Sequence, residues 1–323
     1  METQHHSDEQ DKTPSTEWQR DMINRLAFSS LKEQRAARRW GIFFKLLMFV
    51  YLALILYLYT PSVDMDVAED GKHTALVELD GVIASDEDAN ADNIIEGLRD
   101  AFEDENSAGV ILRINSPGGS PVQAGYINDE IKRLRKEYPD KPLYAVISDI
   151  CASGGYYIAA AADEVYADKA SIVGSIGVRM DGFGFVDAMQ KLGVERRLLT
   201  AGENKGFLDP FEPVKAGDVK HVQELLDDIH QQFIQVVREG RGEKLKDNSD
   251  LFSGYVWTGE QAVELGLVDK LGSSDHVARE VIGAETVVDY TPAEDWLQKF
   301  SKRFGTAMGR GVGQVLGGQF TLK

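Results

Sequence analysis

CASGGYY, residues 151–157, lies where a buried strand is expected to turn into a helix. The apolar run at residues 143–148 predicts the strand, and the alanine-rich run at residues 155–162 predicts the helix. Ser153 therefore stands at a helix N-terminus, where backbone amides favour negative charge. A serine there can cap the helix. It can also act as a nucleophile whose substrate becomes an oxyanion. This stretch by itself leaves both interpretations open.

Bulk properties limit the class of protein. The chain has 323 residues and a formal net charge of -18 at pH 7. That length suits one large domain or two small ones, and that charge argues against a nucleic-acid partner. Cys151 is the single cysteine, so no disulfide can form within the chain. We expect Cys151 to fill a strand end as a small apolar side chain rather than to act as a nucleophile.

A long apolar run predicts a membrane span at residues 41–60. About 20 apolar residues in a helix cross the hydrocarbon layer of a bilayer, and Pro61 ends the helix. A buried core helix fits a run this uniformly apolar less well. A cleaved signal peptide is disfavoured, because a polar stretch precedes the run and no small-x-small pattern follows it.

The charges that flank the span predict its orientation. Basic residues precede it (Lys32, Arg35, Arg38 and Arg39), and acidic residues follow it (Asp64, Asp66, Glu69 and Asp70). The positive-inside rule places the basic side in the cytoplasm. We therefore expect a single-pass protein of the bacterial inner (cytoplasmic) membrane, with its N-terminus in the cytoplasm and the rest of the chain outside. In a two-membrane bacterium that space is the periplasm.

The pattern of the chain divides it into five segments. Residues 1–40 form a polar, basic-ended tail expected to be disordered, residues 41–60 the span, residues 61–72 a linker, residues 73–291 one domain, and residues 292–323 a C-terminal tail. Within the domain, strands are predicted at 74–79, 109–114, 143–148, 164–167, 171–178 and 286–290. Helices are predicted at 91–102, 122–136, 155–162, 218–238 and 258–265. Repeated βαβ units indicate an α/β fold with parallel pairing.

Two glycine-rich turns follow two of these strands. They are Pro117-Gly118-Gly119 and Ser153-Gly154-Gly155. Glycine allows positive φ and a close approach of backbone to substrate, so the amides of such turns can form an oxyanion hole. Tight turns without any ligand are the alternative. Neither turn has the pattern of a phosphate-binding loop.

A serine nucleophile needs a general base. No histidine lies between His73 and His221, and nothing in the sequence marks a Ser-His-Asp triad, although none is excluded. A lysine can serve if its pKa falls from about 10.4 to about 7–8, which burial without a carboxylate partner achieves. Lys205 is a candidate, on a glycine-flanked loop that we expect to follow a strand. Taken alone, a loop lysine is ordinarily a surface charge.

Four motifs in order give the chain a family resemblance. They are INSPGGS at 114–120, ASGGYY at 152–157, GSIGV at 174–178 and the loop of Lys205 at 200–210. The chain resembles bacterial signal peptide peptidases of the SppA type, which are Ser-Lys peptidases of family S49. The resemblance covers about residues 74–290 and the single N-terminal span.

The resemblance implies roles for individual residues. Ser153 would be the nucleophile and Lys205 the general base, with Ser175 hydrogen-bonding the lysine and orienting it. The oxyanion hole would consist of amides from Gly118, Gly119 and Gly154, and neither a cofactor nor a metal is implied. Two departures from relatives are Asn204, where histidine is common, and Cys151, at a variable position. Neither removes a catalytic group.

The resemblance also implies a fold, an assembly and a substrate class. The family fold is the ClpP/crotonase-like spiral of ββα units. Its short-chain members form a membrane-seated homo-oligomeric ring in which serine and lysine meet across a subunit boundary, and we expect the same here. The substrates would be remnant signal peptides. The alternatives are a crotonase-fold acyl-CoA enzyme, which an outward-facing anchored domain disfavours, and a non-catalytic membrane scaffold.

Overall fold

The computed structural model describes Met22, residues 38–56 and residues 71–292. The chain divides into two compact units, Met1–Val67 and Ala68–Lys323. The predicted linker and C-terminal tail lie almost wholly outside the described residues, as does most of the N-terminal tail.

The first unit contains a helix at Arg38–Leu56 with a mean hydropathy of 1.8. It is the one helix, among those the structure describes, that is long and apolar enough to cross a membrane. Trp40 packs against Phe43 and Phe44 near its start, with ring centroids 5.7 and 5.8 Å away. The helix begins three residues before the predicted span. The predicted end at residues 57–60 lies outside the described residues.

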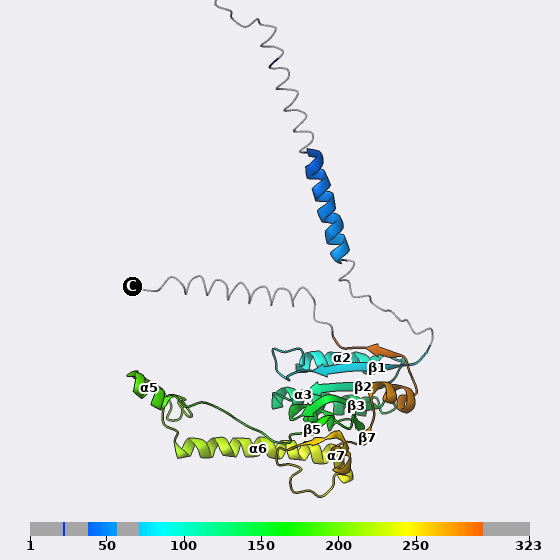
Figure 1. Cartoon of the computed structure of the whole chain (residues 1–323). Coiled ribbons are helices and arrows are strands. Elements are labelled where there is room, and N and C mark those ends of the chain that lie inside the picture. Colours follow the sequence, from blue (N-terminus) through cyan, green and yellow to red (C-terminus); the bar gives the residue numbers. More distant parts are fainter. Residues whose placement is uncertain (1–21, 23–37, 57–70, 293–323) are drawn as a thin grey trace, which may run out of the picture. The chain divides into compact units, whose positions relative to one another are not determined.

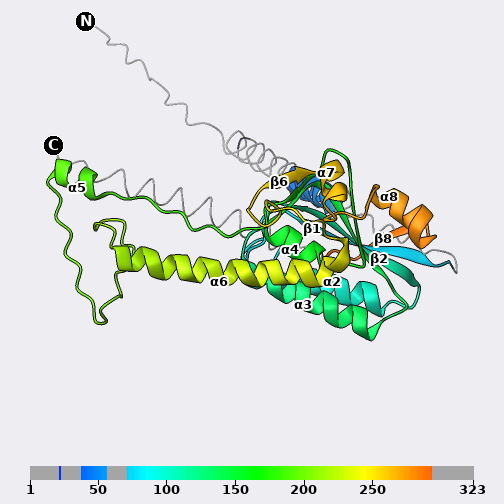
Figure 2. The ribbon, with the colours of Figure 1, turned by 90° about the horizontal axis from the view of Figure 1, so that it is seen from below.

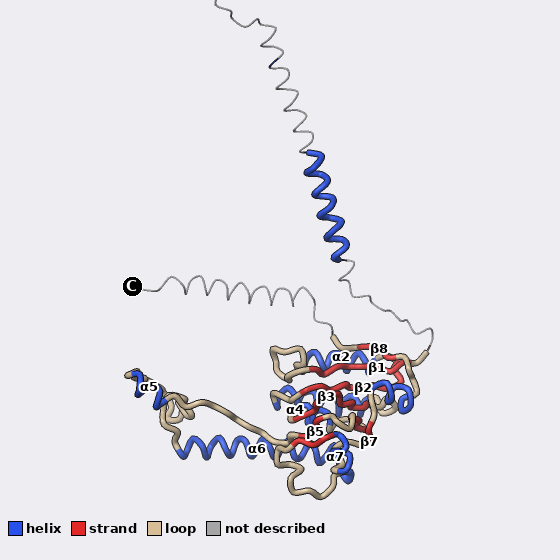
Figure 3. Tube along the Cα trace, viewed as in Figure 1, coloured by secondary structure: helices blue, strands red, loops and turns tan. Residues whose placement is uncertain are grey.

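The second unit is built on an eight-stranded sheet (Figures 1 and 3). The main strand order is β6-β5-β3-β2-β1-β8, while β4 pairs with β3 and β7 with β4. The strands are β1 His73–Asp80, β2 Ser107–Ser116, β3 Leu143–Ala152, β4 Glu164–Ala167, β5 Ile172–Gly174, β6 Val256–Thr258, β7 Lys270–Leu271 and β8 Val287–Asp289. The described pairings are parallel, as predicted, except that β5 and β6 are antiparallel.

Helices connect the strands. They are α2 Ala91–Glu103, α3 Pro121–Glu137, α4 Gly154–Ala159, α5 Val186–Leu192, α6 Ala216–Arg241, α7 Gly259–Glu264 and α8 Ser274–His276, with a 3-10 turn at Gly242–Lys244 and a π-helical turn at Val277–Ile282. Local chemistry sets where they begin. For example, Ser120 caps α3 by accepting a hydrogen bond from the Gln123 amide, and Pro121 occupies the first helical position.

The predicted elements are confirmed, with three differences. The helix after Ser153 ends at Ala159, three residues early. The strand predicted at 171–178 ends at Gly174, because Ser175 has a φ of 52° that breaks the extended backbone. The strand expected before the Lys205 loop is absent: the described residues 194–200 form no strand, and the unpredicted helix α5 precedes them.

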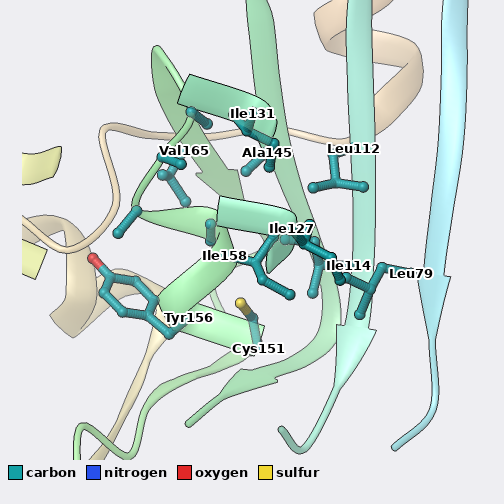
Figure 4. Close-up of a cluster of buried hydrophobic side chains, with 14 of the residues drawn as sticks. Leu79, Leu112, Ile114, Ile127, Ile131, Ala145, Cys151, Tyr156, Ile158 and Val165 are labelled. Atoms are coloured by element: carbon teal, nitrogen blue, oxygen red, sulfur yellow. The ribbon is translucent and has the colours of Figure 1, made fainter. Parts of the chain in front are cut away.

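A buried core holds the strand ends that carry Ser153 and the first glycine turn. Figure 4 shows β1, β2 and β3 contributing Leu79, Leu112, Ile114, Ala145 and Cys151 to one cluster, which α3 and α4 cover with Ile127, Ile131, Tyr156 and Ile158. The Tyr156 hydroxyl donates to the Leu267 carbonyl at 2.7 Å, which satisfies the one polar atom of that ring. Strands buried on both faces explain the long apolar runs of the sequence.

The sheet forks along β3. The first half of β3 pairs with β4, from Tyr144 to Ile147, and the second half pairs with β5, from Ile150 to Ala152. Ser153 therefore leaves the sheet between the carboxyl ends of β2 and β5. Carboxyl ends of parallel strands, at a point where neighbours change, are where α/β sheets commonly form their sites.

Helix α6 has 26 residues and is about 39 Å long. Its C-terminal half packs on the sheet unit, where Phe233 contacts Tyr157 at 5.2 Å between ring centroids. Its N-terminal end contacts the loop that carries Lys205, where His221 lies 6.2 Å from the Phe207 ring. Figure 2 shows α6 joining these two regions.

Candidate active site

Ser153 lies between the last residue of β3 and the first residue of α4 in a strained conformation, with φ 51° and ψ -123°. Its amide donates to the Gly174 carbonyl at 2.8 Å. Its side chain makes no capping hydrogen bond to α4. The capping interpretation therefore does not account for the serine, because the hydroxyl that would perform it is unused.

Strain of this kind is concentrated in the motifs. Among the described residues, the non-glycine residues with positive φ are Ser153, Ser175 and Leu208. Ser153 and Ser175 are the two serines for which the family resemblance implies a chemical role, and Leu208 lies in the loop of Lys205. Such backbone conformations persist only where the surroundings hold them, and they cluster at functional sites.

Cys151 is wholly buried beneath this turn. Burial raises the pKa of its thiol far above the ordinary range, so the thiolate that a nucleophile requires is not formed. The expectation that Cys151 fills space at a strand end is confirmed.

The turn at Gly118 and Gly119 lies directly against Ser153. Gly118 has a φ of +97°, and a Cβ placed on it would lie 2.7 Å from the Ser153 Cβ and 2.8 Å from the Gly154 nitrogen. The turn is held in place by Ile83, whose amide donates to the Gly118 carbonyl at 3.0 Å and whose carbonyl accepts from the Ser120 amide at 2.7 Å. Only glycine permits this approach.

The three candidate oxyanion-hole amides differ in whether they already donate a hydrogen bond within the chain. The Gly118 amide donates to the Ser116 hydroxyl at 3.1 Å, so the expectation that it faces a substrate does not fit the geometry. Within the described part of the chain, the amides of Gly119 and Gly154 have no hydrogen-bond partner. A Cβ on Gly154 would lie 3.3 Å from the Gly119 nitrogen, so these two donors are neighbours beside Ser153.

Ser175 follows β5 as Ser153 follows β3. Ala152 and Gly174 are register partners, and Ser175 donates its amide to the Tyr255 carbonyl at 2.8 Å. The carbonyl of the following residue, Ile176, accepts a hydrogen bond from Nε2 of His230 at 3.1 Å. The sequence had pointed to no role for His230, because a contact between residues so far apart in the chain leaves no local pattern.

Lys205 is exposed, and among the described hydrogen bonds none joins it to Ser153. Its loop is tied to the start of α6, where the Leu208 amide donates to Asp218 Oδ2 at 3.3 Å. His230, which reaches the Ser175 segment, lies about 18 Å further along the helix axis than Asp218, at 1.5 Å per residue. Thus one chain assembles Ser153, Ser175 and the two free amides, and holds Lys205 apart from them.

The described residues contain no group of three histidine, cysteine, aspartate or glutamate side chains that could hold a metal ion.

Comparison with known proteins places the chain in a family. A model of peptidase family S49 matches residues 135–287. The chain is 31% identical over 227 residues to the putative protease MJ0651 of Methanocaldococcus jannaschii, covering 68% of this chain and 72% of that protein. It is also 31% identical over 238 residues to a putative signal peptide peptidase SppA of Enterococcus faecium, covering 71% and 69%.

A stronger local match covers less of its relative. The Na(+)/H(+) antiporter NhaA of Brucella abortus is 49% identical over 186 residues, which are 58% of this chain and 25% of the antiporter. The chain thus spans only about a quarter of that relative's length. The matches to the two protease-named relatives span more than two thirds of each partner, and they establish that this protein belongs to peptidase family S49.

Proposed function

We propose that this protein is a membrane-anchored serine endopeptidase in which Ser153 attacks the peptide bond and Lys205 of a neighbouring copy is the general base. One observation carries the proposal: a strained serine with an unused hydroxyl lies beside two free amides, those of Gly119 and Gly154. A nucleophile next to preorganised donors is the arrangement that acyl transfer requires.

The reaction follows from these positions. Neutral Lys205 takes the proton of the Ser153 hydroxyl while the oxygen attacks the peptide carbonyl carbon. The carbonyl electrons move onto oxygen, which the Gly119 and Gly154 amides stabilise. The tetrahedral intermediate collapses, the C–N bond breaks, and the lysine ammonium protonates the departing amine. Water then attacks the acyl-enzyme and gives a proton to Lys205. As the C–O bond to Ser153 breaks and the acid is released, the lysine ammonium returns that proton to the Ser153 oxygen.

The separation of Lys205 from Ser153 along α6 favours a dyad between chains. A lysine is a base only when neutral, and burial in an interface favours the neutral amine. The segment around Lys205 exposes large apolar side chains, including Phe183 at 82%, Leu192 at 77% and Leu199 at 96%. Exposure on this scale is typical of a surface that a partner covers. We infer that copies of this chain assemble into a closed ring, each lending its lysine to a neighbour.

The remaining parts of the proposal concern the setting. The helix Arg38–Leu56 anchors the chain in the bacterial inner membrane, with the basic flank in the cytoplasm and the catalytic unit outside. Remnant signal peptides are the proposed substrates, in keeping with the name of the Enterococcus relative. The forked, largely parallel sheet agrees with a ClpP/crotonase-like spiral of ββα units.

Mutation tests the dyad. Ser153→Ala and Lys205→Ala should each abolish hydrolysis of a peptide ester and of a synthetic signal peptide, with the oligomer unchanged by size-exclusion chromatography. Lys191→Ala, which removes another exposed lysine of the same segment, should retain activity. Wild-type cleavage by either dyad variant would rule out the assignment, and a silent scaffold or an acyl-CoA enzyme would show no peptide cleavage at all.

The pH dependence identifies the base. A rate that rises to a plateau around pH 8–9 indicates lysine, whereas a plateau near pH 6 indicates a histidine. His230 is the histidine that such a result would implicate, because its ring contacts the Ser175 segment.

A further inference from the structure

We propose that His230 is a positioning residue that holds Ser175 in its working conformation; this rests on the proposed Ser-Lys function. Nε2 of His230 lies 3.1 Å from the Ile176 carbonyl oxygen. Since a carbonyl only accepts hydrogen bonds, Nε2 carries the proton and donates. The bond fixes the peptide group between Ile176 and Gly177, one residue after Ser175.

Ser175 needs such support. Its φ of 52° is unfavourable for a residue with a Cβ, and this conformation persists only where neighbours hold it. The carbonyl of Tyr255, the residue just before strand β6, accepts from the Ser175 amide, and His230 of helix α6 donates to the Ile176 carbonyl. Ser175 is thus fixed from both sides by different elements of the fold, and His230 supplies the side-chain part.

The position of His230 on α6 links three parts of the site. Three residues further along the same helix, Phe233 packs on Tyr157 of α4, the helix that begins beside Ser153. Side chains three apart share a helix face. The other end of α6 holds the Lys205 loop through Asp218. One rigid helix therefore sets the place of Ser175 relative to Ser153, and at its far end it carries the lysine that serves the next copy.

Kinetics separate this role from simple stabilisation. His230→Leu keeps the size and removes the donor, and it should lower kcat by about 10- to 100-fold with little change in KM, since a displacement of about 1 Å in a catalytic constellation has an effect of this order. His230→Gln, which retains a donor, should recover most of kcat. The control Gln232→Leu, an exposed position on the same helix, should behave as wild type.

A double-mutant cycle tests whether His230 acts through Ser175. If it does, His230→Leu added to Ser175→Ala should lower kcat by less than twofold beyond Ser175→Ala alone, because the group being positioned is already absent. Multiplicative losses, or a wild-type kcat in His230→Leu, would overturn the proposal. If the leucine variant does not fold, the same cycle run with His230→Phe, which keeps a ring and removes the donor, decides: additional loss in the Ser175→Ala background rejects the role.

Hydrogen exchange provides a readout that does not depend on peptidase activity. Amides of residues 174–178 should exchange faster in His230→Leu than in Gln232→Leu, while the core strand β2 should be unaffected. Unchanged exchange in that segment refutes the positioning role of His230 even if Ser153 proves to be the nucleophile. If exchange in that segment is faster in His230→Leu but Ser153→Ala stays active, His230 still holds the segment and the proposed function is rejected.

Discussion

Replacing Gly118 by alanine should inactivate this protein by displacing Ser153. The added Cβ would lie 2.7 Å from the Ser153 Cβ, 2.8 Å from the Gly154 nitrogen and 2.7 Å from the Ala152 carbonyl oxygen. Ordinary contacts between such atoms are about 3.5–4.0 Å, so the two turns must separate by about 1 Å. The atoms that must move include the nucleophile and one of the two free amides.

The magnitude of the effect has two parts. A displacement of about 1 Å costs roughly 100-fold in rate, which is about 2.7 kcal/mol of transition-state stabilisation. The φ of +97° at Gly118 adds strain of about 1–3 kcal/mol for any residue with a Cβ, which lowers the free energy of unfolding. We therefore expect a weakened protein whose remaining folded fraction is itself poorly active.

The assay measures kcat/KM on a peptide ester at a temperature where thermal denaturation shows the variant to be folded. Gly125→Ala is the matched control, because this glycine lies in α3 and a Cβ there meets nothing within 4 Å. The control should keep full activity and gain about 0.5–1 kcal/mol of stability. A folded Gly118→Ala protein with wild-type kcat/KM would refute the contact between the glycine turn and the nucleophile.

Three further predictions concern strain, acid sensitivity and a buried ion pair. Ser153→Gly should be more stable than Ser153→Ala by about 1 kcal/mol in urea unfolding, with both inactive, because glycine relieves the positive φ; equal stabilities would contradict the strain. Hydrogen bonds from Arg133 foremost lower the pKa of Glu130 to about 2, so its stabilisation is present above about pH 4.3 and is lost as the pH falls toward 2. Glu130→Gln should flatten a plot of unfolding free energy against pH between about pH 4.3 and 2. An unchanged plot would show that Glu130 does not contribute this stabilisation. Arg241→Met should lower the free energy of unfolding by about 1–3 kcal/mol, because it removes the buried partner of Asp269 and leaves Lys244, whose Nζ lies 2.7 Å from Asp269 Oδ1, as the remaining cation; an unchanged free energy of unfolding would show that Lys244 alone satisfies the carboxylate.

The sequence predicts the strands and helices whose residues are buried within the unit. β2 and β3 carry long apolar runs, and α3 has both a capping serine and a proline at its start. Some short elements, such as β4, β8 and α7, are also predicted, whereas β6, β7, α5 and α8 are not. β6 has three residues and pairs antiparallel only because the fold brings it beside β5, and α5 has no buried residue to give it an apolar stripe.

In the site, too, local motifs could be predicted from the sequence, whereas contacts that depend on the whole fold could not. Ser153 and the glycine turns are local motifs, so their neighbourhood could be predicted, whereas the engagement of the Gly118 amide by Ser116 depends on one side-chain rotamer. The wrong strand before Lys205 has a physical reason. Leu198 and Leu199 look like strand residues, but no neighbouring strand is available to that segment among the described residues, and Leu199 remains exposed. The contact of His230 spans the fold and has no sequence signature.

Mixing two inactive variants tests the dyad between chains most directly. Ser153→Ala and Lys205→Ala are coexpressed, purified as mixed oligomers, and assayed on a peptide ester beside each variant alone. If each site combines Ser153 of one chain with Lys205 of the next, random mixing restores about a quarter of the wild-type activity, because half of the chains supply each group at a head-to-tail interface. If mixed oligomers stay as inactive as the separate variants, Ser153 and Lys205 do not act across a subunit boundary, which contradicts the proposed dyad between chains.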